Sequence, residues 1–253
     1  MFDSNLPLLS ASLAIVLALV HLFARNMRSL STIPRSRWLS FSSGVSVAYV
    51  FIHILPDLGE AQETIRQTLD KTSVNQSLLF LEHHIYLMAL LGISAFYGLE
   101  RAVVVSRQRN EESGKGDIPD IGIFWLHIGS FAVYNALIGY LLFHREEPGI
   151  LSLLFFAIAL GLHFVVNDYG LRENHKHTYD KTGRWVLAAA IIIGAAIGYG
   201  TKIHEAAIAL LFAFLAGGII LNVLKEELPE DRESRFGAFA LGAGIYAVLL
   251  LTA

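Results

Sequence analysis

Residues 206–224, AAIALLFAFLAGGIILNVL, carry no charged side chain. As a helix, a stretch of about 20 mainly apolar residues is long enough to cross the hydrocarbon core of a bilayer. Stretches of this kind recur along the chain, at about 6–24, 38–56, 78–99, 120–143, 150–171, 185–200, 204–224 and 236–253. The sequence therefore predicts an all-α fold, a polytopic membrane helical bundle of eight transmembrane helices in a single transmembrane domain over residues 1–253. The two longest connections, 57–77 and 100–119, are polar.

The overall composition favours the same class. Of the 253 residues, 54% are apolar and 16% are charged, whereas an ordinary soluble domain has about 25% charged residues. A soluble monomer of this size could not bury so much apolar surface, and a disordered chain would be more polar. The net charge of −3 lacks the basic excess of nucleic-acid-binding proteins. Because the chain has no cysteine, disulfides and thiolate metal ligands are excluded.

Positively charged residues are distributed unequally between the two sides of the predicted bundle. With eight spans, the connections after the first, third, fifth and seventh helices lie on one side, and they hold 15 of the 19 Lys and Arg residues. Cytoplasmic connections of membrane proteins are enriched in Lys and Arg. We therefore expect both termini outside, the odd-numbered connections in the cytoplasm and, in a bacterium, the inner membrane as the location.

Two of the predicted spans carry related strings. At a constant separation of 173 positions, residues 41–57 and 214–230 share a phenylalanine, a small residue, a glycine, a valine and a final Leu-Pro-acid sequence. Since the second and seventh spans run in opposite directions, this likeness predicts an inverted 3+2+3 repeat. Inverted repeats are typical of alternating-access transporters that bind substrate near the bilayer midplane. Chance similarity between two Gly- and Leu-rich helices is the alternative interpretation.

Ionisable and amide side chains lie inside two adjacent predicted spans. The fourth contains His127 and Asn135, and the fifth contains His163, Asn167 and Asp168. An ionisable group in the middle of a bilayer costs roughly 2.5–3.5 kcal/mol on insertion scales, so it needs a partner or a function. Imidazole, amide oxygen and carboxylate suit Zn²⁺, Fe²⁺ or Mn²⁺, and these five residues are the predicted metal ligands. The alternative is a set of interhelical hydrogen bonds that holds the bundle together.

A second polar set lies toward the outer ends of the spans. It comprises His53, Asp57, Glu82, His83, His84, His204 and Glu205. These side chains could line a vestibule that concentrates cations, although interfacial His and Glu residues are common without such a role.

This arrangement resembles the ZIP (Zrt/Irt-like) family of divalent metal transporters. The resemblance covers the predicted topology of eight spans with both ends outside and the inverted relation between the first and last three helices. It also covers two short strings, His53-Ile-Leu-Pro-Asp57 at the end of the second span and the run 216–230 that begins Ala-Gly-Gly. The resemblance implies a transporter that moves a divalent metal into the cytoplasm by alternating access.

The same resemblance implies a transport site between the fourth and fifth spans. The family pattern His-Asn-x-x-acid-Gly matches residues 134–139, which keep Asn135. The family pattern His-Glu-x-Pro-(His or Glu) matches residues 163–168. His163 is kept there, and Asn167 and Asp168 follow it as further candidate ligands. His127 has no counterpart in these patterns and is added because of its position in the fourth span. The resemblance implies Zn²⁺, Fe²⁺ or Mn²⁺ as transported substrate, with Zn²⁺ expected first, and no prosthetic cofactor.

The chain departs from the family patterns at two ligand positions, Tyr134 and Ile138, where the family has a histidine and an acid. The alternative function is therefore a ZIP-derived membrane protein with a degenerate metal site, which carries another substrate or binds a partner. An intramembrane metal hydrolase is not expected, because the sequence has no Ser-x-x-x-His or His-x-x-x-His spacing, and we predict that the chain is not an enzyme. Expected partners are the lipid bilayer, a divalent metal ion and, in a homodimer, a second copy of the chain, but not nucleic acid.

Overall fold

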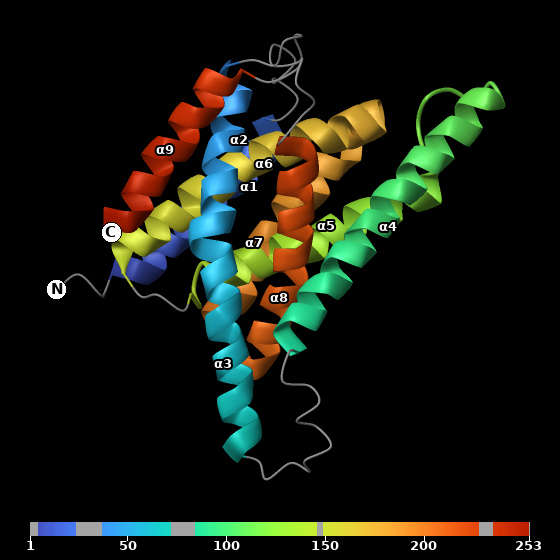
Figure 1. Cartoon of the computed structure of the whole chain (residues 1–253). Helices are drawn as coiled ribbons and strands as arrows, with labels where there is room; N and C mark the ends of the chain where they lie inside the picture. Colours follow the sequence, from blue (N-terminus) through green and yellow to red (C-terminus); the bar gives the residue numbers. More distant parts are fainter. Residues whose placement is uncertain (1–4, 24–36, 72–83, 146–148, 228–234, 253) are drawn as a thin grey trace.

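The structure, a computed structural model, describes residues 5–23, 37–71, 84–145, 149–227 and 235–252. Within these ranges the chain is almost entirely helical and contains no strand (Figure 1). Its helices, with η marking a π-helix, are α1 (Leu6–Phe23), α2 (Arg37–Tyr49), η3 (Val50–Ile54), α3 (Leu55–Lys71), α4 (His84–Glu112), α5 (Ile121–Leu141), α6 (Ile150–Thr178), η5 (Tyr179–Gly183), α7 (Arg184–Gly200), α8 (Glu205–Asn222), η6 (Val223–Glu227) and α9 (Phe236–Thr252). The predicted all-α class is confirmed.

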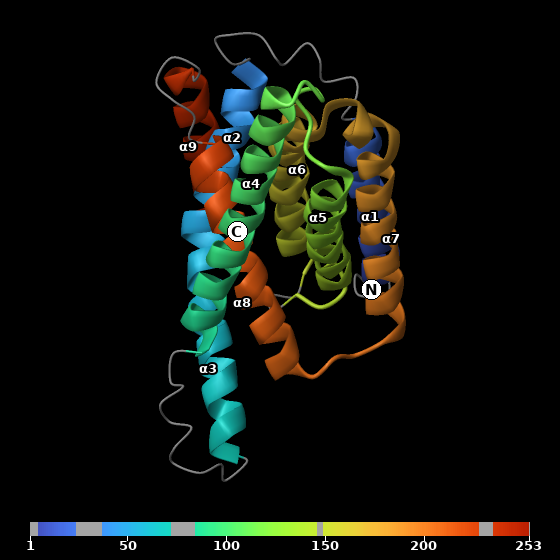
Figure 2. The same ribbon diagram turned by 90° about the vertical axis from the view of Figure 1, so that its right-hand side faces the viewer.

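Six helical segments of the described residues are long and apolar enough to cross a membrane, and Phe236–Leu251 is a shorter apolar helix. The longest segment, Ile150–Gly200, comprises α6, η5 and α7. Within it Lys176 has non-helical dihedral angles (φ 46°, ψ −121°), and Figure 2 shows α6 and α7 as separate arms that run in opposite directions. The number and length of the apolar helices indicate a membrane protein.

The helix that contains the second predicted span is longer than expected. After η3 the chain continues as α3 to Lys71, through most of the connection expected at 57–77. Leu58, Ala61 and Ile65 recur at helical spacing and are buried in the core, and α3 packs against α8. The expectation of a connection over residues 57–71 is therefore wrong, because the polar residues there form the outer face of an amphipathic helix.

Helix α4 likewise continues past the expected end of the third span and ends at Glu112. Ser106 and Asn110, in this extension, are buried. The Ser106 hydroxyl accepts a hydrogen bond from the backbone N–H of Asp120 (2.8 Å), and the Asn110 amide donates to the Ile118 carbonyl (2.9 Å). These contacts tie the end of α4 to the start of α5. Because α4 continues to Glu112, the connection expected at 100–119 begins only after that residue.

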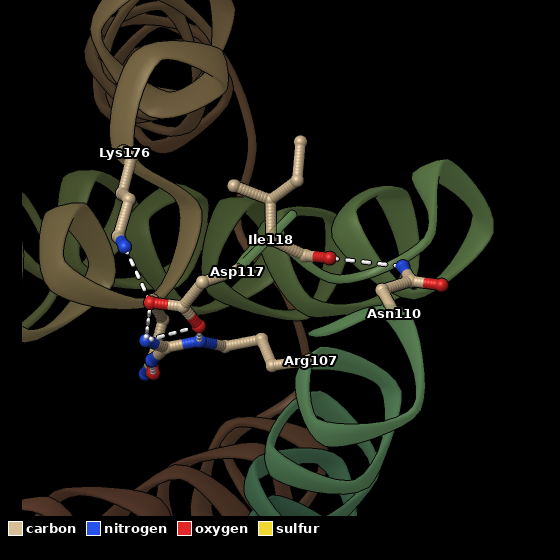
Figure 3. A network of polar contacts seen from close by, with 6 residues as sticks. Arg107, Asn110, Asp117, Ile118 and Lys176 are labelled. Carbon is tan, nitrogen blue, oxygen red and sulfur yellow. Dashed lines mark hydrogen bonds and ion pairs between the residues drawn. The ribbon is translucent and has the colours of Figure 1, made fainter. Parts of the chain in front are cut away.

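An ion-pair network joins the α4–α5 turn to the bend between α6 and α7 (Figure 3). The Arg107 guanidinium donates to both carboxylate oxygens of Asp117 (2.8 and 2.9 Å) and to the Asn174 amide oxygen (3.0 Å). Lys176, at the bend itself, also donates to Asp117. The hydrogen bonds from Arg107 and Lys176 hold the pKa of the Asp117 carboxyl well below its ordinary value.

Three pairs of helices approach so closely that a Cβ atom on a glycine of either helix would overlap backbone atoms of the other. The pairs are α2 with α9 (Gly44, Gly242), α4 with α8 (Gly92, Gly217) and α5 with α7 (Gly139, Gly194). Small residues at such crossings allow membrane helices to pack backbone against backbone. Glycine is therefore required at these positions for the observed helix spacing.

The α2–α9 and α4–α8 pairs cross in the same way, as do α5 and α7, where Gly139 faces the Ile191 carbonyl and the Ala195 amide. In each pair a glycine faces the carbonyl of one partner residue and the amide of the residue four positions further on: Gly44 with Phe239 and Ala243, and Gly217 with Ala89 and Ile93. These two glycines occupy equivalent positions of the related strings, and each string continues into a π-helix, η3 or η6, that begins at its valine. In Figure 1 α2 and α9 run downward along the chain, whereas α4 and α8 run upward.

Several of the largest buried side chains of the core lie on α5 and α6. Tyr134, Phe124 and Phe131 of α5 and Phe164 of α6 are among the largest fully buried side chains. Helix α1 packs against α6 and α7, and α5 packs against α7. This packing places the polar side chains of α1, α5 and α6 in the interior of the bundle.

Candidate functional site

Four fully buried polar side chains, His21, Asn135, Asp168 and Tyr179, meet between α1, α5, α6 and η5. We call them the inner cluster. Nδ1 of His21 lies 2.8 and 2.9 Å from the two carboxylate oxygens of Asp168, and Nε2 lies 2.9 Å from the Asn135 amide oxygen. The Tyr179 hydroxyl donates to Asp168 Oδ1 (2.6 Å). The cluster thus joins α1 to both predicted ligand-bearing helices.

Local helix contacts orient the Asn135 amide within the cluster. Its nitrogen donates to the Phe131 carbonyl one turn earlier in α5 (2.7 Å). A carbonyl can only accept, so this hydrogen bond assigns the nitrogen end of the amide and leaves the oxygen facing His21. Nε2 of His21 must then carry a proton and donate it to Asn135.

The hydrogen bonds also require a proton on the other side of the imidazole. Since Nε2 of His21 is already protonated, the proton at Nδ1 either stays on the ring, giving an imidazolium beside a carboxylate, or lies on Asp168, giving a neutral pair. Both arrangements have zero net charge. A buried charge is tolerated only when it is paired and hydrogen-bonded, and the inner cluster satisfies this condition with groups from several helices.

The other predicted ligands of α6 lie nearer its N-terminal end. His163 and Asn167 are buried, with 3% and 5% of their surface exposed. The His163 ring packs against the Tyr134 ring, with centroids 6.2 Å apart. The structure therefore brings Asn135 and Asp168 together through His21, and brings His163 to Tyr134, which stands at a ligand position of the family pattern.

His127 lies in a different network, which we call the end cluster and which comprises Glu100, His127, His175 and Lys225. Nδ1 of His127 lies 2.8 Å from Nε2 of His175, and Nε2 of His127 lies 3.0 Å from the Glu100 carboxylate. Lys225 donates to the other oxygen of Glu100. The end cluster links α4, α5, α6 and η6, and within it His127 contacts none of the four other predicted ligands.

Part of the outer polar set lines a cavity. His53 and Asp57, whose Nδ1 and Oδ1 atoms are 3.6 Å apart, line a cavity of about 50 Å³ together with His144 and Arg145. The last two residues also line a neighbouring cavity of about 530 Å³, with Glu205 among its other lining residues. Glu82 and His83 lie outside the described residues, and nothing is described of the His84 side chain.

The positively charged side chain of Arg145 borders both cavities. Arg145 donates to the backbone carbonyls of Leu142 (3.1 Å) and Gly149 (3.0 Å). Burial lowers the pKa of its guanidinium. The side chain is therefore fixed at the connection between α5 and α6, where it adds a positive charge to the wall of both cavities.

Among the described residues, no group of three or more His, Asp or Glu side chains is arranged to hold a metal ion. The inner cluster offers one imidazole, one carboxylate and one amide oxygen, a donor set that suits Zn²⁺ once the protons between these groups are lost. A metal bound there would replace hydrogen bonds that the cluster now makes to itself.

Sequence analysis missed His21, Tyr179 and Glu100 as parts of these clusters. A signal for His21 existed, because it is the one ionisable side chain within Leu6–Phe23, and an ionisable residue inside a span is a candidate functional residue. Its partner Asp168 is 147 residues away in the chain, and no local pattern predicts that pairing.

Comparison of the chain with protein-family models, with curated proteins and with solved structures found no match in any of the three.

Proposed function

We propose that the chain is a ZIP-like membrane transporter, and not an enzyme, that moves a divalent metal ion, with Zn²⁺ first, into the cytoplasm by alternating access. The observation that carries this proposal is the inner cluster, in which His21, Asn135 and Asp168 place metal-ligand types in the buried interior of a helical bundle. Such side chains are costly to bury in a membrane and mark ion pathways.

The helix arrangement supports an inverted repeat of eight spans. Counting Ile150–Gly200 as two crossings and adding Phe236–Leu251 to the other segments gives eight. The α2–α9 and α4–α8 pairs cross through equivalent residues and run in opposite directions. Matching π-helices in η3 and η6 add a second point of likeness. Two such halves could rock around a site between them.

Polar groups recur along the proposed path. The cavity at His53 and Asp57 lies at one end of the bundle, His163 follows along α6, then comes the inner cluster, and the end cluster lies beyond it at His175. With the Lys- and Arg-rich connections in the cytoplasm, the end cluster is at the cytoplasmic end and both termini are outside. In this proposal Asn135, His163, Asn167 and Asp168 bind the ion in passage, and His127 contacts it near the exit.

Zinc uptake into liposomes tests this proposal. The purified full chain is reconstituted into vesicles that contain a zinc-sensitive dye, and the initial rate is compared with that of Asp168→Asn and His163→Ala. We expect each variant to lower the rate about tenfold or more, as loss of about 1.4 kcal/mol of ion binding would do. Glu63→Gln, on the outer face of α3, is the matched control and should transport normally. Unchanged uptake in both site variants would refute this site.

The second candidate is a ZIP-derived protein that no longer transports metal. The observation that favours it is that the His21 ring already contacts both Asp168 and Asn135, so an internal side chain occupies the space between two predicted ligands. Isothermal titration of the detergent-solubilised chain with ZnCl₂ separates the two candidates. Stoichiometric binding that is lost in Asp168→Asn supports transport, whereas absence of such binding together with absence of uptake supports the second candidate.

A further inference from the structure

The bend between α6 and α7 has a backbone conformation that its own sequence does not favour. Lys176 is the only non-glycine residue with a positive φ in the described ranges (φ 46°, ψ −121°). Residues in such sparsely populated conformations persist only where surrounding contacts impose them, and they are concentrated in functional and switching segments. We therefore expect the bend to relax when the contacts that hold Lys176 are lost.

A carboxylate in the α4–α5 turn supplies these contacts. Asp117 accepts hydrogen bonds from the Lys176 ammonium at the bend and from the Arg107 guanidinium on α4, which donates to both of its oxygens. In Figure 3 the side chains of Lys176 and Arg107 reach this carboxylate from two sides. A second ion pair, between Arg172 and Asp180, also spans the bend. It joins two parts of the same segment, so it does not tie the bend to another helix.

The network around Asp117 connects two helices that pack mainly against others. Helix α4 packs against α3, α5 and α8, and at this end of the bundle polar side chains link it to α6. They belong to the Asp117 network and to the end cluster, whose His175 directly precedes the bend. Arg107, Asp117 and Lys176 have 25%, 37% and 45% of their side-chain surface exposed, whereas His175 is buried. Water and dissolved ions thus reach the network before they reach the end cluster.

The end cluster contains a polar atom that would gain a partner if the bend opened. Within the described residues, Nδ1 of His175 is buried and has no hydrogen-bond partner, whereas its Nε2 lies 2.8 Å from Nδ1 of His127. A buried polar atom without a partner is unfavourable, and contact with water removes that cost. The strained backbone of Lys176 and this nitrogen both favour opening of the bend, and the ion pairs of Asp117 oppose it.

We propose that Asp117 is a latch that closes this end of the bundle. While Asp117 pairs with Arg107 and Lys176, the bend keeps its strained conformation and the end cluster stays closed to water. When the pairs break, the bend relaxes and water reaches the end cluster. Exposed ion pairs are screened by salt, so the ionic strength of the adjacent solution controls how often the latch opens. The proposal concerns the conformation of the bundle and is independent of metal transport.

Hydrogen–deuterium exchange of the detergent-solubilised full chain, measured by mass spectrometry, tests the latch. In Asp117→Asn the backbone amides of residues 174–183 should exchange about fivefold faster than in the unmodified chain, the effect of losing one exposed ion pair. Over the same time the amides of residues 153–165, in the other half of α6, should stay protected. The matched control, Glu112→Gln, removes the same charge from the exposed end of α4 outside the network and should exchange normally.

Salt provides a second arm that needs no variant at the bend. Raising the NaCl concentration from about 0.05 M to about 0.5 M should accelerate exchange of residues 174–183 in the unmodified chain, because the Debye length shortens and the ion pairs weaken. In Asp117→Asn, which lacks these pairs, the acceleration should be much smaller.

A cysteine reporter measures access to the interior beside the bend. Ile128 is fully buried next to Gly183 of η5, and the chain has no cysteine of its own, so Ile128→Cys carries a single thiol. Its reaction with N-ethylmaleimide should be about fivefold faster in combination with Asp117→Asn and unchanged in combination with Glu112→Gln. Leu153→Cys, buried in the other half of α6, should stay unreactive in both backgrounds.

Three results would overturn the latch. The first is exchange at the bend, or labelling of Ile128→Cys, that is the same in Asp117→Asn as in Glu112→Gln. The second is simultaneous loss of protection at residues 153–165 or labelling of Leu153→Cys, since the variant would then unfold as a whole. The third is exchange at the bend of the unmodified chain that does not respond to salt.

Discussion

At the scale of single residues, the contacts within the inner cluster depend on His21. Its imidazole is the one side chain that contacts both Asp168 and Asn135 within the inner cluster. Removing one partner of a buried charge pair costs more than the pair contributes, because the other group stays buried without compensation. The role of His21 in stability can therefore be measured apart from any role in transport.

His21→Ala should lower the free energy of unfolding by about 1–3 kcal/mol if the pair is neutral and by about 3–5 kcal/mol if it is ionised, because the buried Asp168 carboxyl group and the Asn135 oxygen lose the imidazole. Thermal unfolding of the detergent-solubilised protein measures the change. His177→Ala removes an exposed histidine close to the α6–α7 bend and serves as the control. Equal melting temperatures for the two variants would show that the inner cluster contributes nothing to stability.

A pH-dependent contribution is expected from Asp117. Its pKa is lowered in the folded state by Arg107 and Lys176, so the carboxylate stabilises the fold above the ordinary pKa of about 3.9 and the contribution is lost as pH falls through the lower, folded-state pKa. The difference in unfolding free energy between the unmodified chain and Asp117→Asn should be constant above about pH 5 and shrink below about pH 4. A difference that grows on acidification contradicts this assignment.

At the scale of elements, the bend between α6 and α7 and the close helix crossings determine the fold. Lys176 has a positive φ at the bend, a conformation that costs a non-glycine residue about 1–2 kcal/mol. On either side of it, His175 joins the end cluster and Tyr179 joins the inner cluster. A single turn of chain thus connects both buried networks.

A comparison of Lys176→Gly with Lys176→Ala separates the cost of the positive φ at the bend from the loss of the ion pair with Asp117. Both variants lose the exposed ion pair with Asp117, which is worth about 0–1 kcal/mol, but only glycine relieves the positive φ. We expect Lys176→Gly to be more stable than Lys176→Ala by about 1 kcal/mol in thermal unfolding. Equal stability would show that the bend is unstrained.

The helix crossings give a second prediction at this scale. A Cβ at Gly44 or Gly217 would meet partner backbone that cannot move without separating the helices. Gly44→Ala and Gly217→Ala should each lower the melting temperature strongly and to a similar extent, since their crossings are alike. Gly59→Ala, on α3, meets nothing within 4 Å and should be tolerated. A large effect of one crossing variant and none of the other would contradict the likeness of the two pairs.

The elements also show how far sequence reasoning reaches. Apolar runs such as 206–224 predict helices reliably, because a spanning segment must satisfy its own backbone hydrogen bonds. The helical extension into α3 was missed because its buried face consists of only a few small or aliphatic residues, such as Ala61 and Ile65. Asn135 and Asp168 were predicted to meet, but His21, which joins them, comes from a helix far away in the chain, and its position depends on tertiary packing.

At the scale of the whole molecule, the orientation of the bundle in the membrane determines which of its two ends faces the cytoplasm. The absence of cysteine from the sequence makes single-cysteine labelling possible in an unmodified background. Lys202→Cys, between α7 and α8, should react with a membrane-impermeant maleimide in intact cells. Lys115→Cys, in the exposed α4–α5 turn, should react only after lysis. The reverse pattern would place the termini in the cytoplasm and invert the proposed direction of transport.

The most direct test of metal transport is to locate the ion. Crystals of the protein grown with zinc, measured on both sides of the zinc absorption edge, should show an anomalous peak between His21, Asn135 and Asp168, with His21 displaced from its present hydrogen bonds. The peak should vanish in Asp168→Asn crystals. Zinc-soaked crystals that leave the inner cluster hydrogen-bonded to itself and show no peak in the membrane interior would contradict a metal transport site there.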